Sequence, residues 1–201
     1  MTVAAPERVL CGEGANGRYR TIVADPPWRQ PSGGVHNGSD GRLIRNRPSV
    51  LPYPTLTLGD IQGLPVAALA APDSHLYLWV TNHYLEHAWE IAREWGFTPS
   101  VLLTWAKEVR GIGMGGAFTQ TSEHILFARR GTLPALERIN TTVFHWPRRA
   151  HSVKPEAFLD LVESVSPGPY LELFARRQRL GWDTWGNEAL EHVELGQRRS
   201  K

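Results

Sequence analysis

The chain has 201 residues and one cysteine, and its 22 Lys and Arg residues nearly balance its 20 Asp and Glu residues, for a net charge of +2. A chain of this length buries one good hydrophobic core, so we expect a single domain over residues 1–201. The lone Cys11 excludes an intramolecular disulfide. The N-terminus has no signal-peptide pattern and no apolar run is long enough to span a membrane, so we expect a cytoplasmic protein without a membrane partner.

The positive charge is nearly all arginine, with 19 arginines against three lysines. Arginine forms paired hydrogen bonds with phosphates and base edges, which favours a nucleic-acid partner. A genome whose codons favour arginine explains the composition equally well. Arg42, Arg45 and Arg47 are candidates to hold substrate phosphates, and a solvated cluster of loop charges is the alternative.

Hydrophobic periodicity predicts strands that alternate with helices. Short β-branched or aromatic runs predict strands, in chain order, at residues 20–24, 75–80, 101–105, 123–128, 142–145 and 170–174. Apolar residues at three- and four-residue steps predict helices at 58–70, 82–95 and 155–165. Residues 26–54, rich in Gly, Pro, Asn and Ser, predict a long loop of a kind that is usually functional or mobile. The core then spans about residues 20–187, followed by a charged tail at 188–201.

This alternation predicts an α/β fold, a three-layer sandwich with a mainly parallel sheet. In such sheets the functional residues gather at the carboxyl ends of the strands. Three polar residues directly follow predicted strands in this way, namely Asp25, Asn82 and Arg176. We therefore expect them at one edge of the sheet, with Asn82 as a substrate-binding residue.

The tetrapeptide Asp25-Pro26-Pro27-Trp28 follows the first predicted strand. The prolines have a fixed φ and no N–H, so the backbone here is rigid and only accepts hydrogen bonds. An ionised Asp25 is also an acceptor only, and Trp28 offers a flat aromatic face. Together they are suited to bind a planar ring that carries an exocyclic amino group. The alternative is a rigid turn in which Asp25 caps a helix and Trp28 belongs to the core.

The N6 amino group of adenine fits this pocket, and the chemistry of its methylation needs such a pocket. The N6 lone pair is delocalised into the ring and is a poor nucleophile. The Asp25 carboxylate and the Pro26 carbonyl would hold both amino hydrogens and direct the lone pair at a methyl donor. A sulfonium methyl group needs no further activation, so alignment supplies much of the rate. Asp25 is then chiefly an orienting acceptor that takes up the released proton late.

Several segments together carry a family resemblance. They are V-A-D-P-P-W at 23–28, Y-P-T-L at 53–56, L-Y-L-W-V-T-N at 76–82, W-G-F at 95–97, S-E-H-I-L-F at 122–127, H-S-V-K-P at 151–155, and L-E-L-F-A-R at 171–176 with G-N at 186–187. In this order they resemble the adenine-N6 methyltransferase family. That family includes the catalytic subunit of the eukaryotic mRNA adenosine methyltransferase and small bacterial and phage enzymes. The resemblance covers residues 21–187.

The resemblance implies a Rossmann-like methyltransferase that depends on S-adenosylmethionine, with the motifs in permuted order. The catalytic loop would be Asp25, Pro26, Pro27 and Trp28, and Tyr53 would lie in the loop that binds the target base. The implied cofactor-binding residues are Asp25, Lys154, Pro155, Glu172, Leu173, Phe174, Arg176 and Asn187. No metal is implied. The chain departs from the eukaryotic pattern at Ser122, Gln178 and Glu188, so these three are not assigned as cofactor contacts.

Two other patterns resemble known functional motifs, but we prefer simpler interpretations of both. The segment H-Y-L-E-H at 83–87 matches an inverted zinc-protease motif, but five residues match by chance, and an amphipathic helix explains them. The glycine-rich segment 111–116 lacks the Gly-Lys-Ser/Thr ending of a phosphate-binding loop and precedes a strand. We interpret it as a mobile lid over the base pocket.

The sequence therefore predicts an enzyme that methylates adenine N6 in nucleic acid, with DNA favoured over RNA. The target base must leave its stack to reach Asp25, and Trp28 and Tyr53 are candidates to hold it. RNA methylation is one alternative. The other is a non-catalytic nucleic-acid-binding partner subunit, against which the intact tetrapeptide argues. A homodimer or a complex with a partner subunit agrees with the sequence.

Overall fold

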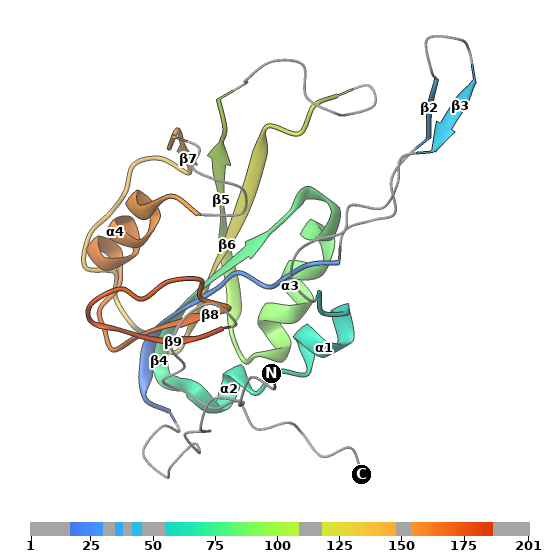
Figure 1. The fold of residues 1–201 in the computed structure, drawn as a ribbon. Helices are drawn as coiled ribbons and strands as arrows, with labels where there is room; N and C mark the ends of the chain where they lie inside the picture. Colours follow the sequence, from blue (N-terminus) through green and yellow to red (C-terminus); the bar gives the residue numbers. More distant parts are fainter. Residues whose placement is uncertain are drawn as a thin grey trace, which may run out of the picture.

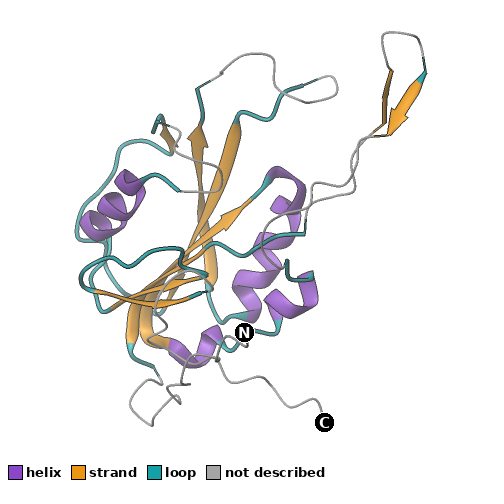
Figure 2. Ribbon diagram, viewed as in Figure 1, coloured by secondary structure: helices purple, strands orange, loops and turns teal. Residues whose placement is uncertain are grey.

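A seven-stranded sheet lies between two layers of helices in the computed structural model of the chain (Figures 1 and 2). The structure describes residues 17–29, 35–37, 42–45, 55–108, 118–147 and 154–186. One face of the sheet packs against three helices, which are α1 (Leu58–Gln62), α2 (Val66–Leu69) and α3 (Leu85–Glu94). The other face packs against α4 (Glu156–Val165). This arrangement confirms the expected three-layer α/β sandwich.

The strands of the sheet follow the order β7-β5-β6-β4-β1-β8-β9. Their bounds are β1 (Tyr19–Ala24), β4 (Ala70–Val80), β5 (Thr98–Ala106), β6 (Ser122–Arg130), β7 (Val143–Phe144), β8 (Tyr170–Leu173) and β9 (Trp182–Trp185). Four of the six pairings are parallel, and β6 is antiparallel to both its neighbours. No described helix separates β5 from β6, so the two strands pair as an antiparallel hairpin rather than by a crossover. The prediction of a mainly parallel sheet is confirmed.

Some predicted elements differ from those observed. The predicted helix 58–70 is two helices, because Gly63 caps the end of α1 and Pro65 precedes α2. The predicted helix 82–95 begins with the 3-10 helix η1 (Asn82–Tyr84). Strand β9 was not predicted, nor was the hairpin of β2 (Val35–Asn37) and β3 (Leu43–Arg45), which lies within the predicted loop 26–54. Two-residue alternation in these short segments is too brief to stand out from the surrounding turn residues.

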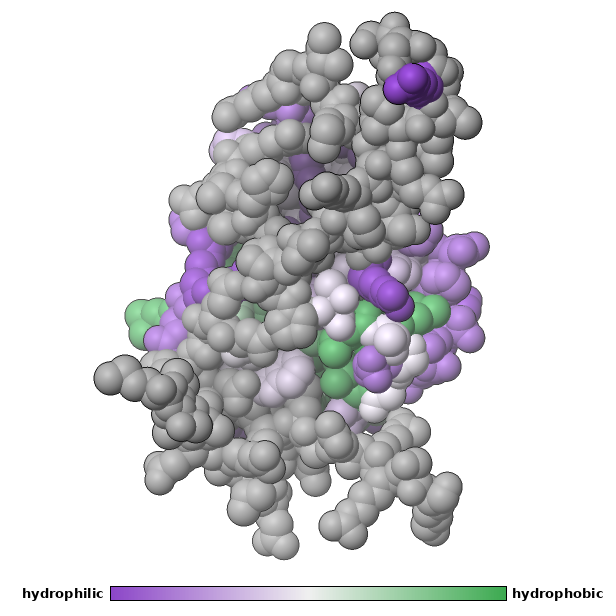
Figure 3. Space-filling view, turned by 45° about the vertical axis from the view of Figure 1, so that its right-hand side comes forward, coloured by the Kyte–Doolittle hydropathy of each residue, from purple (hydrophilic) through white to green (hydrophobic). Residues whose placement is uncertain are grey.

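Strand β1 lies in the interior of the sheet, between β4 and β8, and is buried on both faces. Ile22 and Ala24 contact the core under α1, α2 and α3, whereas Val23 belongs to the core under α4. The side of the molecule shown in Figure 3 has mostly hydrophilic described residues around a small apolar patch. Within the described residues, no helix is long and apolar enough to cross a membrane.

The connections of the sheet reverse direction between β1 and β8. From β1 the chain crosses to β4 on one side, and from β8 it continues to β9 on the other side. Such a reversal opens a crevice at the carboxyl ends of the two parallel strands. Ala24 pairs with Leu173, so Asp25 and Phe174 are the first residues beyond the sheet at this crevice.

Candidate active site

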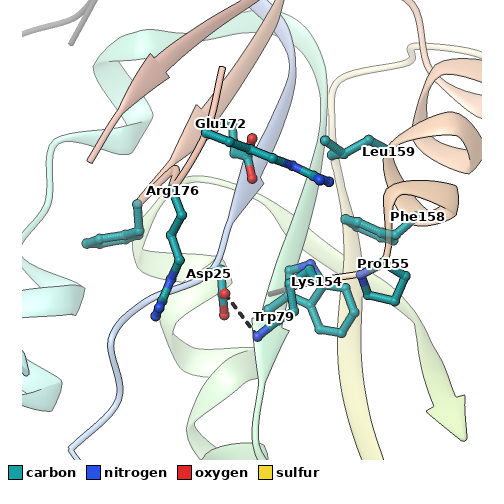
Figure 4. Close-up of a pocket in the computed structure, with 10 residues that line it drawn as sticks. Asp25, Trp79, Lys154, Pro155, Phe158, Leu159, Glu172 and Arg176 are labelled. Carbon is teal, nitrogen blue, oxygen red and sulfur yellow. Dashed lines mark ion pairs between the residues drawn. The ribbon is translucent and has the colours of Figure 1, made fainter. Parts of the chain in front are cut away.

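A pocket of about 450 Å³, measured with its open mouth, occupies this crevice between the ends of β1 and β8 and the first turn of α4 (Figure 4). Its lining combines two carboxylates and three cationic side chains with an apolar wall. The lining residues are Asp25, Trp79, Lys154, Pro155, Phe158, Leu159, Glu172, Phe174, Arg176 and Arg177. A pocket with such a mixed wall suits a ligand that has charged groups and apolar parts.

Four charged side chains form a row that begins at the pocket. Lys154 Nζ lies 2.9 Å from Asp25 Oδ2 and 3.2 Å from Glu123 Oε2. The other oxygen of Glu123 binds Lys107 Nζ. Lys154 Nζ also lies 4.9 Å from the ring centre of Trp79, which provides the floor beneath the ion pair. The row therefore links the end of β1 to β6 and to the residue that follows β5.

The charges in this row decide one another's protonation. Burial raises the pKa of Asp25 above its ordinary value, and the ammonium of Lys154 opposes that rise. Burial would lower the pKa of Lys154, but the carboxylates of Asp25 and Glu123 raise it above its ordinary value. Burial would raise the pKa of Glu123, which Lys154 and Lys107 instead hold below its ordinary value. The two carboxylates therefore favour the charged form of Lys154, while the pKa of Asp25 stays above its ordinary value.

Glu172 has an unusual environment in the same pocket. Its Oε2 atom is buried and has no hydrogen-bond partner among the described residues. Burial, followed by the negative charge of Asp25, raises the pKa of Glu172 to about 7. A buried acceptor without a donor is costly, so this oxygen is suited to receive a hydrogen bond from a ligand. S-adenosylmethionine, the expected cofactor, has ribose hydroxyls and amino groups that donate such bonds, so the residues present fit it.

The loop between β8 and β9 forms one wall of the pocket and is fastened to α4. Arg179 makes two hydrogen bonds with Glu163, Nε to Oε1 at 2.8 Å and Nη2 to Oε2 at 2.7 Å, and a third with Asp160 at 2.6 Å. Trp182 Nε1 donates to the same Glu163 carboxylate at 2.6 Å. Paired bonds of this kind hold direction as well as distance. The wall that carries Arg176 is therefore held in a defined position against α4.

The tetrapeptide at the end of β1 forms a tight loop. The Trp28 N–H donates to the Pro26 carbonyl at 2.8 Å, and the Leu56 N–H donates to the Pro27 carbonyl at 3.1 Å. Trp28 is 4% exposed, its Nε1 donates to the Trp79 carbonyl at 3.1 Å, and its ring stacks on another aromatic side chain. The expectation that Trp28 stacks on the target base does not match this structure, because core packing covers its ring.

The structure brings together six of the residues expected at the cofactor site. These six all line the pocket and are Asp25, Lys154, Pro155, Glu172, Phe174 and Arg176. Leu173 does not, because side chains alternate along β8 and its side chain packs fully buried in the core under α3. Asn82 lies instead in a separate open depression beside α3, together with Leu85 and Trp89. Tyr53, Asn187 and the glycine-rich segment 111–116 lie outside the described residues.

Three residues of the site were not predicted. Glu123 and Lys107 belong to the charged row, and Trp79 supports Lys154. The signal for Glu123 was present, since it is a carboxylate near the start of a strand with an apolar middle, inside a segment that carried the family resemblance. Nothing in the sequence paired Lys107 with it, because their contact depends on the β5–β6 register.

The histidines of the zinc-protease-like segment pack around a tyrosine. His83 lies in η1 and contacts the Tyr84 ring edge-on at 4.8 Å, and the ring of His87 in α3 lies 6.3 Å from it. Across the described ranges, no three His, Cys, Asp or Glu side chains are grouped as metal ligands. The aromatic contacts account for the placement of both histidines.

Comparison with known proteins identifies the family. A family model described as MT-A70 matches residues 19–188. The type II methyltransferase M.MunI of a Mycoplasma species is 31% identical over 85% of this chain and 78% of its own length. The human N(6)-adenine-specific methyltransferase METTL4 is 31% identical over 88% of this chain and 39% of its own length.

A third relative is the N6-methyladenosine RNA methyltransferase MTA1 of Cryphonectria parasitica, 30% identical over 86% of this chain and 52% of its own length. The chain thus spans about half or less of METTL4 and MTA1, but most of M.MunI. The family model and the first relative both cover most of the chain. The chain therefore belongs to the MT-A70 family of S-adenosylmethionine-dependent methyltransferases.

Proposed function

We propose that this protein transfers the methyl group of S-adenosylmethionine to N6 of adenine in DNA. The observation that carries the proposal is the position of Asp25, a carboxylate held by Lys154 at the mouth of the pocket, directly before two proline carbonyls. A planar amine that enters here meets acceptors and no backbone donor from the prolines.

In this proposal Asp25 and Pro26 orient the amino group. The Pro26 carbonyl already accepts the Trp28 N–H and has a second lone pair for one amino hydrogen. Asp25 Oδ2 is bound to Lys154, which leaves Oδ1 for the other hydrogen. With both hydrogens held, the nitrogen lone pair points away from the two acceptors, toward the pocket. When bound, the cofactor supplies an electrophilic methyl group on its sulfonium.

Lys154 has two roles in the proposed reaction. Its positive charge opposes the rise that burial causes in the pKa of Asp25, and so favours the ionised carboxylate, which is an acceptor. Its distance of 2.9 Å from Oδ2 also fixes the carboxylate plane. After transfer the amino nitrogen must release a proton, and Asp25, whose pKa burial raises, is suited to take it up and pass it to water.

The cofactor site in this proposal is formed by Glu172, Phe174, Arg176, Lys154 and Pro155. The Oε2 atom of Glu172, which has no partner among the described residues, would accept a hydrogen bond from a ribose hydroxyl or an amino group of the cofactor.

DNA is favoured as the substrate because M.MunI, which the chain matches over most of both lengths, is named as a type II methyltransferase. RNA is the second candidate, because relatives matched over about half their length are named as RNA methyltransferases. We also propose that the protein acts in the cytoplasm.

The test is methyl transfer from labelled S-adenosylmethionine to single-stranded and duplex DNA and RNA, with identification of the modified nucleoside. We expect N6-methyldeoxyadenosine as the main product. Asp25→Ala should abolish transfer while cofactor binding, measured by calorimetry, largely survives. Asp73→Ala is the matched control, because Asp73 lies near the start of β4, does not line the pocket, and accepts a hydrogen bond from the backbone N–H of Thr132. Full activity of Asp25→Ala, or a product other than N6-methyladenine, contradicts the proposal.

A further inference from the structure

The loop 25–29 depends on donors from other elements. Pro26 and Pro27 have no N–H, so this segment offers consecutive carbonyls and few donors of its own. The carbonyl of Pro27 accepts the backbone N–H of Leu56 at 3.1 Å. The carbonyl of Arg29, at the exit of the loop, accepts the hydroxyl of Tyr84 at 2.6 Å. Tyr84 therefore fastens the end of the loop that is farthest from the Asp25–Lys154 ion pair.

The ring of Tyr84 fastens the same loop a second time. It stacks on the indole of Trp28 with ring centres 4.9 Å apart and planes inclined by 22°. Trp28 is fixed in turn, since Nε1 donates to the carbonyl of Trp79 at 3.1 Å. The side chain of Trp79 lies beneath Lys154, the partner of Asp25. A continuous set of contacts therefore joins Tyr84 to the reacting end of the loop.

Tyr84 is itself held firmly enough to act as an anchor. It is the last residue of η1, the short helix that follows the carboxyl end of β4, and its N–H donates to the carbonyl of Thr81 at 3.0 Å. His83 packs edge-on against its ring, and His87 from the first turns of α3 lies on it at a tilt. The hydroxyl and the ring are thus presented from an element that belongs to the folded core.

We propose that Tyr84 is a positioning residue for methyl transfer, which sets the loop Asp25–Arg29 through its hydroxyl bond to Arg29 and its stack on Trp28. The inference rests on the proposed function of the same loop. Tyr84 does not line the pocket, so its effect reaches the substrate only through the loop. A displacement of about 1 Å at a reacting group costs up to about 100-fold in rate, so a loosened loop lowers turnover.

The test is Tyr84→Phe, which removes the hydroxyl and keeps the stack. We expect kcat to fall about 10-fold, because the exit of the loop is no longer fixed. KM for the nucleic acid and Kd for the cofactor should change less than about twofold, because no pocket contact is lost. Tyr84→Leu, which also removes the stack, should lower kcat about 100-fold.

Tyr170→Phe is the matched control, because it removes a hydroxyl bond of the same kind, from Tyr170 to the carbonyl of Ser166 at 2.9 Å, outside the pocket and the loop. It should lower Tm as much as Tyr84→Phe and leave kcat unchanged. A Tyr84→Phe enzyme with wild-type kcat overturns the proposal, as does an equal loss of kcat in both variants.

Hydrogen exchange provides a readout that does not depend on activity. In Tyr84→Phe the peptide that contains residues 25–29 and the amide of Leu56 should exchange faster, while the strands β4 and β6 exchange as in the wild type. Unchanged exchange in this peptide overturns the anchoring role. If the wild type shows no adenine methylation but the exchange result holds, the proposed function fails and the anchor stands.

Discussion

Lys154 Nζ lies 2.9 Å from Asp25 Oδ2, although the two residues are far apart in the sequence. Asp25 follows β1, an interior strand of the sheet, and Lys154 shortly precedes α4. The ion pair is buried against Trp79, where the low dielectric strengthens it and also makes either charge costly alone. The state of each residue therefore depends on the other, and the first prediction below concerns that dependence.

Replacement of Lys154 by methionine should raise the pKa of Asp25 further, because burial then acts without its opposing charge. The acid limb of the pH–rate profile should move to higher pH, so activity falls more at pH 6 than at pH 9. Steady-state rates across pH measure this shift. Lys154→Arg keeps the charge and should leave the limb near its wild-type position, whatever the rate. A profile of unchanged shape in Lys154→Met contradicts the assigned role.

Glu172 should destabilise the free protein as pH rises. Its pKa is about 7 in the folded protein and 4.5 in the unfolded chain, so between these values the folded state binds the extra proton. Stability therefore falls as pH rises from about 4.5 to 7, by about 3 kcal/mol at most. Glu172→Gln should be more stable than the wild type at pH 8, with the advantage shrinking toward pH 5. Urea unfolding measures this, and a pH-independent difference would contradict it.

His75 should change the stability with pH in the opposite direction to Glu172. Its Nδ1 lies 2.7 Å from Ser166 Oγ and its Nε2 lies 3.1 Å from the Leu133 carbonyl, and burial lowers its pKa below the ordinary 6.5. In the unfolded chain His75 binds a proton near pH 6.5, whereas in the folded protein it binds one only at lower pH. Stability is therefore lost as pH falls below 6.5. His75→Gln should reduce this loss between pH 6.5 and 5. Part remains, because burial also lowers the pKa of His124.

The same urea series, repeated on His75→Gln at several pH values, measures the slope of stability against pH. A slope equal to that of the wild type would show that His75 is protonated in the folded protein too.

Gly186 should not tolerate a side chain. A Cβ there would lie 2.3 Å from the carbonyl oxygen and 2.5 Å from the nitrogen of Ala175, so the segments after β8 and β9 would have to separate. Gly186→Ala should cost about 3 kcal/mol in stability. It should also weaken cofactor binding about 10-fold, because Ala175 lies between the pocket residues Phe174 and Arg176. Gly181→Ala is the control, since no atom of the described residues lies within 4 Å of the added Cβ and its φ of +84° opposes the change, at about 1 kcal/mol. Equal costs in unfolding and in cofactor titration would sink this account.

Sequence patterns identified most of the fold, and their failures have physical causes. β1, β4, α3, β6, α4 and β8 have clear apolar periodicity and were all predicted. β9 carries two tryptophans separated by polar residues, and only pairing with β8 makes it a strand. Leu173 was assigned to the cofactor site because it sits in a matching segment, but strand alternation turns it into the core.

The sequence by itself determined that Pro26 and Pro27 offer carbonyl acceptors and no N–H donors, because a proline lacks the N–H in any fold. It also determined the family, because that evidence is the order of motifs along the chain. Only the tertiary structure decided that Trp28 is covered by Tyr84, that Glu123 and Lys107 continue the charged row from Lys154, and that Glu172 retains an unsatisfied oxygen. Burial and pairing are properties of neighbours distant in sequence, and strand register brings those neighbours together.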